Sequence, residues 1–172
     1  MIALGHAPTP PESTRGNIYL PIITTAPADP VADFCRLLVG DRRQQRLRLE
    51  LCPMLQQAAI WRAHGLANGE PWDHVDSHGV TPNEYARRAG CRLPDDYAPK
   101  GNNIESLVAG SSDAAAMFNA LAGSAKHADH LFGRGWFQKQ DRFGIAICEG
   151  GEPYRWYWCV MLGECLGQVS GE

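Results

Sequence analysis

The densest group of metal-ligating side-chain types lies in a loop-like segment near the middle of the chain. Asp73, His74, Asp76 and His78 fall within six residues, and the last three alternate as side chains on one face of an extended segment do. Imidazole and carboxylate groups bind zinc and also act as acid–base catalysts. A solvated loop with satisfied hydrogen bonds has the same composition, so both interpretations stay open.

A short helix is predicted directly after this loop. Thr81 is a good N-cap, Pro82 suits the first helical position, and Glu84 lies three residues after the cap, where it completes a capping box. Gly90 supplies the C-terminal stop. Segment 72–91 is therefore interpreted as a loop that leads into a helix.

Two further histidines, His127 and His130, stand three residues apart in a helical turn that Ser124 begins. Side chains at this spacing share one helix face, so they are candidates to share a metal, although a pair of partly exposed histidines is the commoner explanation. Ser124 is also a candidate nucleophile with a histidine as base. No G-x-S-x-G or H-E-x-x-H motif accompanies it, which disfavours a hydrolase.

The remaining pattern predicts an α+β domain, with helices packed on a small antiparallel sheet and no parallel βαβ units. Segment 92–100 has two prolines and no periodicity, which indicates a loop. We expect one helix to start at Asp29–Pro30 and a second to run from Pro53 to Asn68–Gly69. A third helix is expected over 113–122, capped by Ser111 or Ser112, and a hairpin over 143–162.

Length and charge narrow the class of protein. At 172 residues the chain fits one domain, and a net charge of −3 provides no basic field for a phosphate backbone, so nucleic acid is not an expected partner. No run of about 18 apolar residues predicts a transmembrane segment. The first residues lack the charged and apolar regions of a signal peptide.

Six cysteines, none in a C-x-x-C motif, favour disulfides and an oxidising environment. Cys148 and Cys159 flank a Gly-Gly-Glu-Pro turn, and we expect a cross-strand disulfide between them. Buried free thiols are the alternative.

Residues 1–28 are predicted to form a proline-rich arm, and 29–172 the domain. Six of the 12 prolines lie in the first 30 residues, which favours an extended polyproline-like strand. Its apolar cluster at 18–23 suits packing against another protein subunit, and the alternative is an arm folded along its own domain.

Several short motifs, taken in order, resemble the CAP superfamily of cysteine-rich secretory, antigen 5 and pathogenesis-related 1 proteins, especially its bacterial SCP-like branch. The resemblance covers roughly residues 31 to 163. The matching positions are the proline and alanine-rich segment 49–59; His74, Gly79, Thr81, Pro82, Ala86 and Gly90; Gly101, Asn103 and Ile104; Ser124 and His127; and Gly144 with Tyr157 and Trp158.

The resemblance implies an α-β-α sandwich with a central cleft where His74 and His127 meet, a place at which several members bind a divalent metal such as zinc. The glutamate of the family's G-E-N-I motif is Asn102 here, so any divalent metal is expected to bind weakly. Asp76, His78, Glu105 and His130 are the open alternatives for a replacement ligand.

The family consists generally of secreted binding modules with no agreed common catalytic activity. The resemblance therefore implies an extracellular binding or structural module. One hypothesis makes the chain a subunit of an extracellular or virion assembly, with the arm as connector. The alternative is a secreted protein that binds a ligand or a metal in the cleft, and a metal-dependent hydrolase is a weaker third hypothesis.

Overall fold

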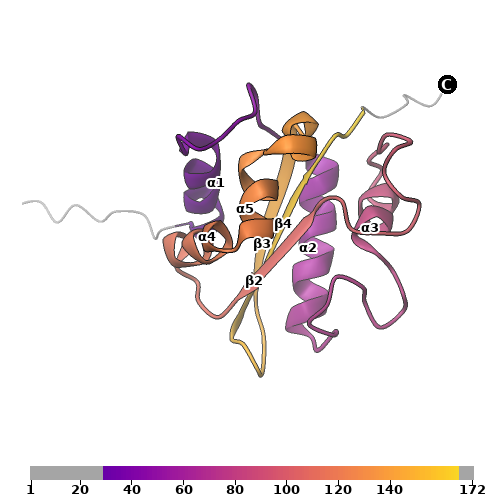
Figure 1. Cartoon of the computed structure of the whole chain (residues 1–172). Helices are drawn as coiled ribbons and strands as arrows, with labels where there is room; N and C mark the ends of the chain where they lie inside the picture. Colours follow the sequence, from indigo (N-terminus) through magenta and orange to yellow (C-terminus); the bar gives the residue numbers. More distant parts are fainter. Residues whose placement is uncertain (1–28, 167–172) are drawn as a thin grey trace, which may run out of the picture.

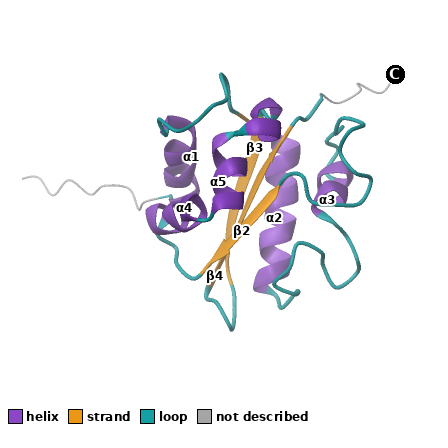
Figure 2. Cartoon of the chain, viewed as in Figure 1, coloured by secondary structure: helices purple, strands orange, loops and turns teal. Residues whose placement is uncertain are grey.

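A four-stranded sheet lies between two layers of helices in the computed structural model, which describes residues 29–166 (Figures 1 and 2). The strand order is β1-β3-β4-β2, with β1 over Glu50–Leu51, β2 over Glu105–Ala109, β3 over Arg142–Glu149 and β4 over Trp156–Gly163. The predicted arm at 1–28 lies outside the described residues.

The β3/β4 hairpin is the centre of the sheet and confirms the predicted hairpin. Phe143, Ile145 and Ile147 face one helical layer, while Ala146 and Cys148 face the other. Strand β2 pairs antiparallel with β4 along five residues. The alternation along one hairpin thus supplies both hydrophobic cores.

One layer contains α2 (Pro53–Ala67) and α3 (Pro82–Arg88). The other contains α1 (Pro30–Gly40), α4 (Ala114–Gly123) and α5 (Ala125–Phe132), as Figure 1 shows. A short 3-10 helix, η1 (Gly135–Lys139), connects α5 to β3.

Helix α2 packs directly on the backbone of β3. A Cβ added at Gly144 would lie 2.2 Å from the backbone nitrogen of Gln56, so glycine is needed there because of the close approach. The side chain of Gln56 completes the contact, since its Nε2 donates to the Ile145 carbonyl (2.8 Å) and its Oε1 accepts from the Ile145 N–H (2.9 Å). This helix is thereby fixed against the sheet.

Local capping signals place the helix starts as predicted at most positions. The Asp29 carboxylate accepts from the N–H groups of Val31 and Ala32, and the Thr81 and Glu84 side chains form a reciprocal capping box. The predicted cap of the helix α4 is wrong: Asp113, and not Ser111 or Ser112, accepts from the first-turn N–H groups of Ala115 and Ala116.

The sheet also contains a parallel pair that the sequence did not predict. Glu50 and Leu51 of β1 lie beside Arg142 and Phe143 of β3 in parallel register. A segment of two residues, separated by Cys52 from the proline that starts α2, is too short to show a periodic pattern. Within residues 29–166, no helix is long and apolar enough to cross a membrane.

The predicted disulfide between Cys148 and Cys159 is wrong, and both thiols are free. The hairpin register places Cys148 opposite Tyr157 and Cys159 opposite Ala146, so the two cysteines are two positions out of register. The disulfide of this fold instead joins Cys91, just after α3, to Cys165, just after β4, with Cα atoms 5.3 Å apart.

Because the Cys91–Cys165 bond closes a long loop, its removal should destabilise the domain. We expect the double variant Cys91→Ala/Cys165→Ala to lose about 2 to 5 kcal/mol of unfolding free energy, measured by urea denaturation. The single variant Cys148→Ala, at a free thiol, is the control and should lose less than about 1 kcal/mol. Non-reducing peptide mapping that finds Cys148 linked to Cys159 would contradict this assignment.

Candidate functional site

A pocket of about 390 Å³ lies beside the start of β2 and the start of α5. It brings together three residues that the family resemblance singled out: His74, Asn102 and His127. His74 and His127 are 53 positions apart in the sequence, so only the fold places them at one site. We call this the histidine pocket; its lining residues are His74, Asn102, Asn103, Glu105, Ser106, Ser124, Lys126, His127, His130 and Phe137.

Glu105 is the one carboxylate that lines the histidine pocket, and it is buried at 4% exposure. Its Oε2 lies 3.3 Å from Nε of Arg62, a side chain of α2 that is completely buried. The thiol of Cys159 also donates to Oε2, at 3.5 Å. A buried charge is stable only when it is paired, so Arg62 is the group that keeps this carboxylate in the interior.

His74 is held by the same carboxylate. Its Nδ1 lies 2.8 Å from Oε1 of Glu105, and because an ionised carboxylate only accepts, Nδ1 carries the proton. In the neutral ring Nε2 is therefore the unprotonated nitrogen. The Arg62 guanidinium also donates to the backbone carbonyl of Asp73, so it binds the loop as well as the carboxylate.

His127 is half-buried in the first turn of α5, and its Nδ1 lies 2.9 Å from Oγ of Ser124. Ser124 is the N-cap residue of this helix, yet its hydroxyl makes no capping hydrogen bond. Burial and the nearby His74 lower the pKa of His127 below its usual value.

His130 lies deeper, fully within the protein. Its Nε2 is 3.5 Å from the Leu162 carbonyl, so the proton is on Nε2 and Nδ1 accepts from the Ser106 hydroxyl at 2.7 Å. Burial and the charge of Arg46 lower the pKa of His130 to about 3. This histidine is neutral at physiological pH and links β2, β4 and α5.

Asp76 and His78 do not line the histidine pocket. Asp76 shapes the preceding loop: Oδ1 accepts from the N–H groups of His78 and Val80, and Oδ2 accepts from the Tyr85 hydroxyl at 2.6 Å. Burial alone would raise the pKa of Asp76, but these hydrogen bonds outweigh it and lower that pKa. The sequence cluster at 73–78 is thus mainly a hydrogen-bonded loop that positions His74.

Asn102 lines the pocket but uses its amide to start β2. Its Oδ1 accepts from the N–H groups of Ile104 (3.2 Å) and Glu105 (2.8 Å), and its Nδ2 donates to the Glu105 carbonyl (3.1 Å). The carbonyl oxygen of this side chain already has two donors, which uses both of its lone pairs.

These residues do not fit the divalent metal that the resemblance implies. Zinc sites in proteins use three or four protein ligands, whereas His74 and His127 each have one ring nitrogen, Nε2, without a hydrogen-bond partner among the described residues. Both oxygens of Glu105 already contact protein groups, Oε2 the Arg62 guanidinium and Oε1 the His74 ring, and the carbonyl oxygen of Asn102 accepts from two N–H groups. Across residues 29–166, no group of three His, Cys, Asp or Glu side chains is placed to hold a metal ion.

The pocket also divides the parts of a hydrolytic triad among different histidines. A triad needs one imidazole between a hydroxyl and a carboxylate. Here Glu105 orients His74, which has no hydroxyl partner, while the hydroxyls of Ser124 and Ser106 bond to His127 and His130. His130, with a pKa of about 3, is also too weak a base at neutral pH.

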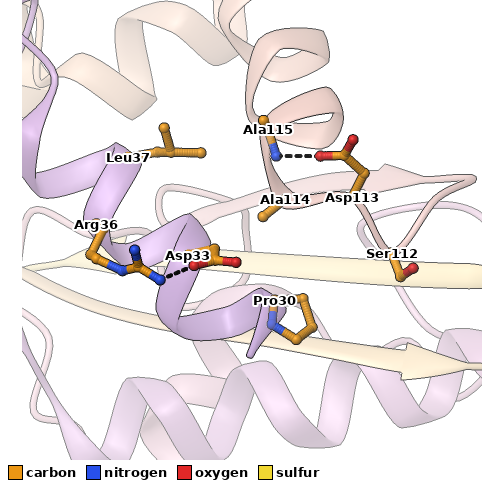
Figure 3. A pocket seen from close by; sticks show the side chains of 8 residues that line it. All are labelled: Pro30, Asp33, Arg36, Leu37, Ser112, Asp113, Ala114 and Ala115. Carbon is orange, nitrogen blue, oxygen red and sulfur yellow. Dashed lines mark hydrogen bonds and ion pairs between the residues drawn. The ribbon is translucent and has the colours of Figure 1, made fainter. Parts of the chain in front are cut away.

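A larger hollow of about 610 Å³ lies between α1 and the start of α4, as Figure 3 shows. Its charged side chains already have partners: Asp33 pairs with Arg36, and Asp113 accepts from the Ala115 N–H at 2.8 Å. Since no cluster of unused polar groups lines it, the histidine pocket is the better candidate site.

The sequence did not identify Arg62, Ser106 or Lys126 as site residues. Arg62 did fall on the otherwise apolar stripe of its helix, with Leu55, Ala59 and Leu66. An arginine in such a stripe indicates a buried ion pair, although the stripe does not name the partner.

Comparison with known proteins gives the fold. No protein-family model and no curated protein matches the chain. Two solved structures are similar. An outer surface protein from Borrelia burgdorferi matches at 18% identity with a TM-score of 0.58, covering 78% of this chain and 91% of that one. An extracellular protein containing a SCP domain from Bacillus anthracis str. Ames matches at 14% identity with a TM-score of 0.57, covering 78% and 40%. The chain therefore has an α+β, CAP-like fold.

The ion pair under the pocket should dominate local stability. We expect Arg62→Met to cost about 3 to 5 kcal/mol of unfolding free energy, because it leaves the Glu105 charge buried without its cation. The double variant Arg62→Met/Glu105→Gln should recover at least half of that loss, measured by urea denaturation.

Arg155→Met is the matched control, since it removes an arginine from the exposed pair with Glu149 and should cost less than about 1 kcal/mol. Equal losses for Arg62→Met and Arg155→Met would show that the buried pair does not stabilise the site.

Proposed function

We propose that this chain is an extracellular binding module that takes a small ligand in the histidine pocket, without catalysing a reaction on it. The observation that carries the proposal is the preorganised lining of that pocket. His74, His127 and His130 each have a fixed hydrogen-bond partner. Such a rigid, partly polar concavity is typical of a ligand site.

A metal-dependent hydrolase is the less favoured function. It would require an open metal site with three protein ligands and an activated water, and the pocket offers only the Nε2 atoms of His74 and His127. No single imidazole in the pocket bonds both to Glu105 and to a serine hydroxyl, which argues against a serine hydrolase at this site.

An extracellular location is supported by two observations. The Cys91–Cys165 disulfide suits an oxidising compartment. In addition, the two similar structures are described as an outer surface protein and an extracellular protein.

The binding function is tested by screening the full-length chain with a fragment set of equal numbers of anionic, neutral and cationic small molecules. We expect the amide NMR signals that shift to belong to pocket residues such as His74, Ser106 and His127. Shifts confined to the hollow between α1 and α4, or no shifts with any fragment, would contradict the proposal.

A second candidate function is that of a structural subunit, in an extracellular or virion assembly, with residues 1–28 as connector. The composition of that segment favours it, because proline-rich chain loses little backbone entropy on ordering and residues 18–23 supply apolar anchors.

If the segment connects subunits, deletion of residues 1–28 should convert an oligomer into a monomer, because the apolar anchors are removed. Size-exclusion chromatography with light scattering measures this directly. A full-length chain that is itself monomeric, or a truncated chain that assembles as the full-length chain does, would exclude the connector function.

A further inference from the structure

The histidine pocket has an excess of positive charge. Its one carboxylate, Glu105, is balanced by the buried guanidinium of Arg62. Lys126 also lines the pocket, and within residues 29–166 it takes part in no ion pair. The ammonium group of Lys126 is therefore a positive charge without a compensating anion.

Arg46 adds a second positive charge behind the pocket. This side chain is 7% exposed and donates to the carbonyls of His130 (2.7 Å) and Leu131 (3.0 Å) and to Gln44 Oε1 (2.9 Å). None of these acceptors is a carboxylate, so the charge remains uncompensated. Its field reaches the pocket lining, because it is one of the causes of the lowered pKa of His130.

The pocket offers a cation few free acceptors. The Glu105 oxygens are taken by Arg62, His74 and Cys159, and the Asn102 carbonyl oxygen is taken by two backbone N–H groups. Besides the Nε2 atoms of His74 and His127, the lining offers the Lys126 ammonium and the first-turn amides of α5, which the Ser124 side chain does not cap. The helix dipole there has the same positive sign.

We propose that the histidine pocket binds an anionic group, the phosphate or carboxylate of a small molecule, with Lys126 as its principal charge partner. This inference rests on the proposed binding function and names its ligand class. The family resemblance implied a divalent metal in this cleft, and the proposal reverses that expectation. A site whose one carboxylate is neutralised by a buried arginine favours an anion over a divalent cation.

The test is to titrate the full-length chain with inorganic phosphate and with acetate at fixed ionic strength, following pocket amides by NMR. Lys126→Gln should weaken binding of the better anion at least tenfold, because it removes the uncompensated charge. Lys100→Gln makes the same charge change at an exposed position outside the pocket and should change affinity less than twofold.

A second pair of variants tests the sign of the charge without risk to the fold. Asp and Asn are both as good at an N-cap as the native Ser124. Ser124→Asp places a carboxylate at the pocket, whereas Ser124→Asn adds an uncharged group of the same size. Anion affinity should be at least tenfold lower in Ser124→Asp than in Ser124→Asn, and equal affinities would overturn the proposal.

The two proposals fail in different ways. If neutral or cationic fragments, or Zn²⁺, bind at the pocket while phosphate and acetate do not, the anion preference is wrong and the binding function stands. If nothing shifts the pocket amides, both are wrong. Phosphate shifts that persist unchanged in Lys126→Gln would overturn the anion site assigned here.

Discussion

The buried ion pair between Arg62 and Glu105 is the interaction on which the candidate site depends. It joins α2 to β2 on the face of the sheet that α2 covers, with both side chains shielded from solvent. The same guanidinium holds the Asp73 carbonyl, and the same carboxylate holds the His74 ring. Because a buried charge is stable only with its partner, the helix, the strand and the loop are positioned together.

The internal use of Glu105 changes what the pocket can bind. A carboxylate that forms a buried ion pair with an arginine and accepts from an imidazole and a thiol is already engaged by the protein itself. Asn102, which stands where the resemblance has a glutamate, has a parallel effect, since its amide oxygen accepts from the N–H groups of Ile104 and Glu105. The bonding of Glu105 and of Asn102 thus reduces the number of free oxygen acceptors in the pocket. The Lys126 ammonium remains available, which is why we infer that the site favours an anion.

The sequence predicted those features that depend on neighbouring residues. The caps at Asp29 and Thr81 and the alternation along β3 are local, and the structure reproduces them. The expected disulfide was two positions out of register, because loop length sets the register of a hairpin and the sequence did not show that the loop spans residues 150–155. Local patterns singled out His74 and His127 separately and the family resemblance paired them, whereas Arg62 required a partner 43 positions away that no local pattern reveals.

The two histidines of α5 show how burial decides between a structural and a binding side chain. His127 and His130 lie on one helix face, and the sequence therefore allowed them to share a metal. In the structure His130 is fully buried and neutral, and its two ring nitrogens contact Ser106 and Leu162, which ties α5 to the sheet. One turn earlier, His127 remains half-exposed beside Lys126. The buried histidine fixes the helix, and the helix in turn holds the ammonium group and the half-exposed imidazole in the lining of the pocket.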